Sequence, residues 1–248
     1  MASQENNTRH TVSAYEQELS QLNSLILRLG GLVEAQTSDA MRAISRRDSE
    51  VAEMVIRKDT ELDELEEEIN DVAVLILARR QPMANDLRVI VSAIKIAGDL
   101  ERAGDYAKNI CKRALVINQA PPISSTRSVP RMVELVQQML GNVLGSYVNL
   151  DVELAREVWE ADEEVDELYN SLFRELLTYM MEDPRNITAA THLLFIAKNV
   201  ERMGDLVTNI AERVFFTATG NQIEDERPKK DVTSVTDADG ETVDGGSA

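Results

Sequence analysis

Apolar residues recur at helical spacing along most of the chain. The first stripe begins near Leu19 and predicts a helix that continues to about Ser45. Asp48 is suited to cap the next helix, and Pro82 ends that helix near Arg80 because proline lacks the amide hydrogen that a helix interior requires. The whole pattern predicts six long helices, over residues 19–45, 48–80 with a bend near 58–60, 85–118, 128–148, 151–181 and 185–217.

Two segments break the helical pattern. Residues 120–126 contain two consecutive prolines and predict a linker, and the residues from Gly220 onward are polar and charged, which predicts disorder. Aromatic residues make up only 4% of the chain, a composition that favours helices over sheets. We therefore expect an all-α protein of two tandem, pseudo-symmetric three-helix bundles. The expected divisions are a first bundle over 1–120, a second over 121–218 and an acidic, disordered tail over 219–248.

One block of sequence occurs twice, one hundred residues apart. Leu-Glu-Arg-Ala-Gly-Asp-Tyr-Ala-Lys-Asn-Ile stands at 100–110, and Val-Glu-Arg-Met-Gly-Asp-Leu-Val-Thr-Asn-Ile stands at 200–210. Upstream, residues 48–65 match residues 151–168 at nine positions. The chain is therefore an internal duplication, and both copies keep paired carboxylates that helix packing alone does not demand.

The repeated acids form pairs four residues apart, which places both carboxylates of a pair on one helix face. The pairs are Asp59/Asp63 and Glu101/Asp105 in the first repeat, and Asp162/Asp166 and Glu201/Asp205 in the second. With the first turn centred at position 82.5, Asp63 lies 19.5 residues before the turn and Glu101 lies 18.5 residues after it. Antiparallel helices would hold the two pairs level to within about 1.5 Å. The second repeat gives the same result, so four carboxylates should converge twice.

Four like charges at one site repel one another unless a cation neutralises them. Oxygen ligands suit hard ions such as Mg²⁺, Ca²⁺ or Mn²⁺ and also iron, and helical bundles build carboxylate metal sites from facing helices. We therefore predict a metal cluster in each repeat and leave the ion open among iron, Mg²⁺, Mn²⁺, Ca²⁺ and Zn²⁺. Asn109 and Asn209 recur one turn beyond the second acid and could supply a carbonyl ligand or a supporting hydrogen bond. Gly104 and Gly204 would allow close helix approach or leave room for an ion.

A reading without metal also fits these residues. Arg102 and Arg202 recur beside the acids and could neutralise them through salt bridges, which would make the protein a purely structural helical adaptor. Asp99 in the first repeat corresponds to Asn199 in the second, so the two clusters need not be equivalent in charge.

Composition excludes several classes of function. The net charge of −18 argues against nucleic acid as a partner, because such sites need clustered Lys and Arg. The single cysteine, Cys111, cannot form an intrachain disulfide and is expected to be packed and inert. The sequence shows neither a secretory signal nor a run of about 20 apolar residues, so we expect a soluble cytoplasmic protein that is not inserted in a membrane.

We find no catalytic apparatus in the sequence. It contains no phosphate-cradling glycine loop and no nucleophile elbow. His192 lies about nine residues short of Glu201 and is expected to be an ordinary helix histidine. Trp159 is expected to anchor the core or an interface. We therefore expect no enzyme, with a metal-dependent carboxylate-cluster enzyme, either a di-iron oxidase or a phosphohydrolase, as the alternative.

Several ordered segments resemble the PhoU family, the phosphate-specific transport system accessory and regulatory proteins. They are Arg80 to Arg88, residues 100–110, Tyr179 to Arg185 and Leu194 to Glu212, and the resemblance spans about residues 10–217. It implies two three-helix bundles, usually as a homodimer, with metal clusters at the Glu/Asp-x-x-x-Asp motifs. It also implies negative regulation of phosphate uptake and of the phosphate-starvation response. The implied partners are the ATPase subunit of the phosphate ABC transporter and a sensor histidine kinase, through which the protein could be peripheral at the inner face of the membrane.

Overall fold

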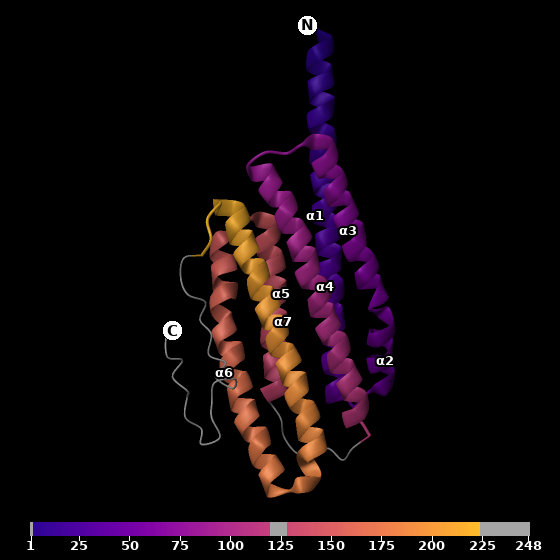
Figure 1. The fold of residues 1–248 in the computed structure, drawn as a ribbon, viewed down its shortest axis with the longest axis vertical. Coiled ribbons are helices and arrows are strands. Elements are labelled where there is room, and N and C mark those ends of the chain that lie inside the picture. The colour runs from indigo at the N-terminus through magenta and orange to yellow at the C-terminus, as the bar shows by residue number, and fades with distance from the viewer. Residues whose placement is uncertain (1, 120–127, 224–248) are drawn as a thin grey trace, which may run out of the picture.

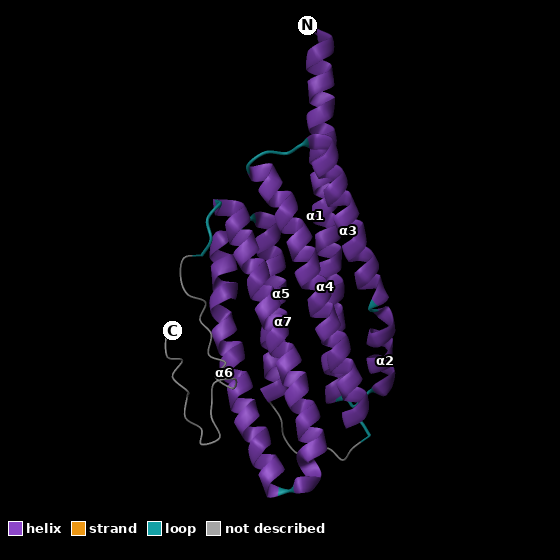
Figure 2. Ribbon diagram, in the orientation of Figure 1, coloured by secondary structure: helices purple, strands orange, loops and turns teal. Residues whose placement is uncertain are grey.

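The computed structural model describes residues 2–119 and 128–223, with side chains from Ala14 onward. Helices account for nearly all of these residues, and no strand occurs among them (Figure 2). The helices are α1 (Ala2–Ser45), α2 (Ser49–Lys58), α3 (Thr60–Arg80), α4 (Asn85–Ile117), α5 (Ser128–Asn149), α6 (Val152–Glu182), the short 3-10 helix η1 (Pro184–Asn186) and α7 (Ile187–Thr219). The expected all-α fold is confirmed, with α2 and α3 forming the second, bent helix. The expected linker at 120–126 and nearly all of the expected tail lie outside the described residues.

The turn that starts the second helix of each repeat has the same construction twice. The Asp48 carboxylate accepts a hydrogen bond from the Val51 amide, and the Asp151 carboxylate accepts one from the Leu154 amide, both at 3.1 Å. Each aspartate therefore satisfies one of the amide groups that a helix start leaves without a partner. This confirms the cap expected at Asp48 and extends it to the second repeat.

The second helix bends and ends where the sequence predicts. The break between α2 and α3 falls at Asp59, which keeps helical backbone angles (φ −59°, ψ −34°). α3 ends at Arg80, and Gln81 then adopts the left-handed conformation with φ 48° while its amide still donates to the Leu77 carbonyl at 3.2 Å. Pro82 follows at the point where no further helical amide is needed.

The two bundles lie side by side and share one hydrophobic core (Figure 1). α1 to α4 form the first bundle and α5 to α7 form the second. In the described part of the chain, the most extensive contact between two helices joins α4 to α7, and α1 also packs against α5. α4 and α7 run in opposite directions, so the beginning of each lies beside the end of the other. A contact between one end of α4 and the opposite end of α7 therefore has an equivalent at the other end of the same boundary.

Two single residues behave as the sequence suggested. Cys111 is fully buried, and burial raises the pKa of its thiol to about 12, which makes it inert at neutral pH. Trp159 is 4% exposed, and its indole N–H donates to Glu212 Oε1 at 3.2 Å. It therefore ties α6 to α7.

The structure contains no candidate membrane span: no helix among the described residues is both long and apolar enough to cross a bilayer.

Candidate functional site

The first acidic cluster consists of Asp59, Asp63, Glu101 and Asp105. The structure brings the two pairs together from the α2–α3 break and from α4, as the residue counts predicted. Burial first, and then repulsion from the other three acids, raises the pKa of Glu101. The pKa of Asp63 is also raised, by burial and by Asp59 and Asp105. The four carboxylates therefore lie within electrostatic reach of one another.

Lys108 is the cation of this cluster. Its ammonium lies between the helices and donates to Asp59 Oδ2 and, at 3.2 Å, to Asp105 Oδ1. Asp59 is 4% exposed, so this contact neutralises a carboxylate that would otherwise be buried with an unpaired charge. The sequence analysis missed Lys108, although its position three residues after Asp105 places it on the same face of α4.

The second acidic cluster consists of Asp162, Asp166, Glu201 and Asp205. Asp162, Asp166 and Glu201 are buried, at 2%, 4% and 5% exposed. Asp63, the residue of the first cluster that corresponds to Asp166, is exposed. Asp162 Oδ1 lies 3.4 Å from the position that a Cβ at Gly204 would take, between Glu201 and Asp205 along α7. The acids of α6 and α7 are therefore level, and this cluster lies deeper than the first.

Glu201 of the second cluster is a buried carboxylate with a raised pKa. Burial raises its pKa to about 6, against the opposing effect of Lys198, and Asp205 adds to the increase. Lys198 Nζ lies 3.1 Å from Glu201 Oε1. The other oxygen, Oε2, is buried and has no hydrogen-bond donor among the described residues. This oxygen could accept a ligand atom or a cation without losing an existing hydrogen bond.

Arg102 and Arg202, which the interpretation without metal pairs with the acids, differ in their contacts. Arg202 approaches Glu201 Oε2 and Asp205 Oδ2 at 3.8 Å each, at the outer limit of an ion pair. Arg102 is exposed and makes no ion pair within the described ranges. Lysines rather than these arginines make the shorter contacts with the acids.

The two repeated glycines, Gly104 and Gly204, lie in different surroundings. A Cβ at Gly104 would overlap the Leu62 side chain, which is 1% exposed and cannot swing into solvent. A Cβ at Gly204 would lie 3.5 Å from Val165 Cγ1, an ordinary contact. Close helix approach therefore explains Gly104, whereas packing leaves room for a methyl group at Gly204.

The donor chemistry of both clusters fits a hard cation, since every candidate ligand is a carboxylate oxygen. In residues 14–119 and 128–223, no group of three or more His, Cys, Asp or Glu side chains is arranged to hold a metal ion. Lys108 lies among the acids of the first cluster, and in the second cluster the buried Glu201 Oε2 has no hydrogen-bond donor among the described residues. The metal assignment remains a prediction.

The two repeated asparagines, Asn109 and Asn209, line different pockets. Asn109 accepts a 3.5 Å hydrogen bond from Lys112 and lines a pocket between α4 and α7. Asn209 lines a second pocket between the same helices. His192 lies within α7 and lines the first of these pockets, and its Nδ1 is buried without a hydrogen-bond partner in the described part of the chain.

Comparison with known proteins agrees with this arrangement. The PhoU domain description matches residues 26–114 and again 129–214, once in each repeat. The chain is 53% identical over 228 residues to a phosphate-specific transport system accessory protein PhoU homolog of Caulobacter vibrioides, covering 92% of this chain and 99% of that protein. It is 49% identical over 227 residues to the homolog of the same name from Rhizobium meliloti, covering 91% of this chain and 96% of that protein.

Solved structures show the same fold. The crystal structure of PhoU from Pseudomonas aeruginosa superposes with a TM-score of 0.81 at 38% identity, covering 84% of this chain and all of that one. The phosphate transport system regulatory protein PhoU from Streptococcus pneumoniae superposes with a TM-score of 0.79 at 30% identity, covering 85% of this chain and 99% of that one. With its domain pattern matched in both repeats and its fold shared with these structures, the chain belongs to the PhoU family.

Proposed function

We propose that this protein is a negative regulator of phosphate uptake and of phosphate-starvation signalling. The observation that carries the proposal is the 53% identity, over 92% of the chain, to a protein named as an accessory of the phosphate-specific transport system. Both acidic clusters lie within the matched segments, so the relationship includes the candidate site.

Regulation through protein contact fits the chemistry of the site better than turnover does. The Cys111 thiol is buried and protonated. His192 lines a pocket with Arg113, whereas a general base serving the carboxylate clusters would have to lie among the acids. The enzyme alternative predicts that metal-loaded protein hydrolyses phosphate esters or consumes oxygen. The present proposal expects neither activity.

The proposed partners are the ATPase subunit of the phosphate ABC transporter, a sensor histidine kinase and a second copy of the chain. Binding to the first two would bring a cytoplasmic protein to the inner face of the membrane. Light scattering on the purified protein should give twice the chain mass. A pull-down with the ATPase subunit should retain this protein, and a mass of one chain or an empty pull-down would contradict the corresponding partner.

The proposed cofactors are metal ions held by the two acidic clusters. An ion would neutralise the carboxylates and tie together the helices that carry them. The support is the convergence of oxygen ligands, the raised pKa values of Asp63, Glu101 and Glu201, and the buried Glu201 Oε2 without a donor. Each raised pKa indicates a site that disfavours the bare negative charge.

Elemental analysis tests the metal directly. Replacing Asp63, Glu101 and Asp105 by Asn, Gln and Asn should lower the bound metal per chain. The matched control replaces three exposed acids of α3, Glu61, Glu64 and Glu68, by Gln and should leave it unchanged. Equal metal content in both triple variants would remove the assignment to the first cluster.

A gene deletion tests the function. In phosphate-rich medium, loss of this protein should raise the uptake of radiolabelled phosphate and switch on a phosphate-starvation reporter. A plasmid copy should reverse both effects. If the reporter and the uptake rate stay at their wild-type levels without the gene, the proposed function is wrong.

A further inference from the structure

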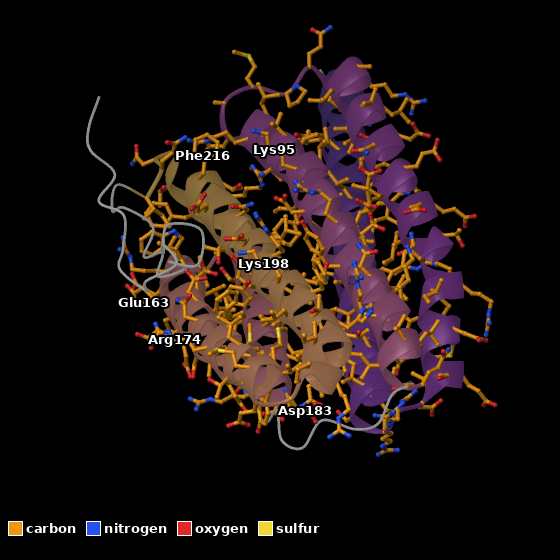
Figure 3. All side chains as sticks on the ribbon, turned by 60° about the horizontal axis from the view of Figure 1, so that its bottom comes forward. Lys95, Glu163, Arg174, Asp183, Lys198 and Phe216 are labelled. Carbon is orange, nitrogen blue, oxygen red and sulfur yellow. The ribbon has the colours of Figure 1, made fainter. Side chains whose placement is uncertain are left out.

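Two pockets lie between α4 and α7, and the duplication relates one to the other. We call the first the basic pocket; its lining includes Lys112, Arg113, His192, Lys198, Asn199 and Arg202. We call the second the twin pocket; its lining includes Ser92, Lys95, Glu212 and Arg213. Positions in the two pockets differ by one hundred residues, the spacing of the sequence repeat. Figure 3 labels Lys198 of the basic pocket and Lys95 and Phe216 of the twin pocket.

The two pockets have similar volumes, about 410 and 450 Å³. Their charges differ. Four cationic side chains line the basic pocket and no carboxylate does, although the chain as a whole carries a net charge of −18. The twin pocket has two cations and the carboxylate of Glu212. Divergence after the duplication has therefore changed the electrostatics and kept the space.

The twin pocket neutralises its own arginine. Arg213 Nε lies 2.8 Å from Asp99 Oδ2, and the Glu212 carboxylate accepts the hydrogen bond from Trp159. At the equivalent positions, the basic pocket has Asn199 in place of Asp99 and Lys112 in place of Glu212. Two substitutions thus remove both negative charges.

Arg113 and Lys112 are left without a carboxylate partner among the described residues. The Arg113 guanidinium lies 4.5 Å from the centre of the Phe195 ring, and Lys112 has only the weak hydrogen bond to Asn109. An arginine over an aromatic ring keeps its in-plane N–H groups available to an anion. These two cations are the available charge of the pocket.

Neutral polar groups complete the lining. His192 Nδ1 is buried without a hydrogen-bond partner in the described ranges. Burial, and secondly the nearby Arg113, lowers the pKa of His192, so its imidazole is neutral at neutral pH and can donate one hydrogen bond. Fixed cations with a neutral donor in a concave site are the recognition chemistry of an oxyanion.

We propose that the basic pocket between α4 and α7 binds a phosphate-class oxyanion, with Arg113 and Lys112 as the principal charges and Lys198 and Arg202 as further lining residues. The pocket volume admits either inorganic phosphate or the phosphoryl group of a small molecule such as a nucleotide. The choice of phosphate as the first probe rests on the proposed function. The preference for an oxyanion rests on the lining of the pocket and is independent of the proposed function.

The decisive experiment is calorimetric titration of the full chain with inorganic phosphate, pyrophosphate and ATP at constant ionic strength, with chloride as the blank. The test variant is Asn199→Asp. In the twin pocket the equivalent residue, Asp99, neutralises Arg213, so this change should place a carboxylate beside Arg113. It should weaken binding about tenfold or more. Lys112→Gln, an exposed and structurally benign change, should weaken binding in the same direction.

Lys95→Gln in the twin pocket is the matched control, because it removes an exposed lysine from the equivalent space. It should leave the affinity within about twofold. Circular dichroism melting of each variant separates lost binding from lost folding. The inference is overturned if the wild-type chain binds none of the three probes, or if Asn199→Asp and Lys112→Gln both bind as the wild type does. A preference for ATP over phosphate would identify a nucleotide as the source of the oxyanion.

These outcomes are independent of the uptake experiment. A chain that restrains uptake but binds no oxyanion contradicts only this inference. A chain that binds phosphate in the basic pocket but leaves uptake unchanged contradicts only the proposed function.

Discussion

Arg213 pairs with Asp99 across the boundary between the two repeats, with 2.8 Å between Nε and Oδ2. Both side chains are largely shielded from water, at 27% and 6% exposed. The contact joins the end of α7 to the middle of α4. It is therefore a fixed charge pair at the contact that holds the two bundles together.

Breaking this pair should destabilise the fold. Asp99→Asn leaves the Arg213 guanidinium half-buried without its anion, and we expect the free energy of unfolding to fall by about 1–3 kcal/mol. Urea denaturation of this variant, of Arg213→Gln and of the double variant forms a cycle whose interaction energy should be non-zero. Lys95→Gln nearby should change stability by less than about 0.5 kcal/mol. Fully additive effects would show that the pair is not energetically coupled.

Two glycines of α4 should respond in opposite ways to alanine. Nothing lies within 4 Å of a Cβ at Gly98, so Gly98→Ala should raise the free energy of unfolding by about 1 kcal/mol through helix propensity. Gly104→Ala forces the buried Leu62 side chain to move, and the strain should outweigh the same gain, for a net loss of about 1–2 kcal/mol. Thermal melting compares the two, and equal shifts would contradict the close approach at Gly104.

Glu201 should make the metal-free protein more stable in mild acid. Its pKa rises from 4.5 to about 6 on folding, so the folded state binds this proton more tightly than the unfolded state. Its stabilising contribution is complete below about pH 4.5 and is lost as the pH rises through about 6. The full effect is about 2 kcal/mol.

Glu201→Gln isolates this contribution from those of the other acids. With a chelator present, the change in unfolding free energy between about pH 7 and about pH 5 should be smaller in the variant than in the wild type. At neutral pH the variant should be at least as stable, because it buries no charge at this position. A pH dependence that is the same in both proteins would contradict the raised pKa.

Lys108 should stabilise the first acidic cluster in the absence of metal. Lys108→Met keeps the aliphatic stem but leaves Asp59 buried without a cation, and we expect a loss of about 1–3 kcal/mol. Lys112→Met removes a lysine without a carboxylate partner in the described part of the chain and should change stability by less than about 0.5 kcal/mol. Added divalent metal should then restore more stability to Lys108→Met than to the wild type, because the ion no longer competes with the ammonium.

Residue counting from the hairpin turns worked because it depends only on helix geometry. α3 and α4 leave a short turn in opposite directions, so equal counts along each helix give equal heights. The same counting could not predict which cationic side chains contact the acids. Lys108 reaches Asp59 across the helix pair, whereas Arg102 faces solvent, and that difference depends on side-chain direction.

How deeply each acidic cluster is buried could not be predicted from the sequence either. Asp63 and Asp166 occupy equivalent positions, yet Asp63 is exposed whereas Asp166 is buried, at 4% exposed. The break at Asp59 interrupts the helix in the first repeat, whereas α6 runs without interruption from Val152 to Glu182. The difference between Asp99 and Asn199 is visible in the sequence. Only the packing of α4 against α7 shows that this difference changes the charge of a pocket rather than that of an acidic cluster.

Lys198 belongs to two neighbourhoods at once, because it lines the basic pocket and also approaches Glu201 at 3.1 Å. A cation taken up by the second acidic cluster would displace this ammonium and leave it to an anion in the basic pocket. Thermodynamic linkage then requires the anion to strengthen the binding of the cation by the same factor. If both proposed sites are filled, a chain whose oppositely charged sites share one lysine would be most fully occupied when the cation and the anion are present together.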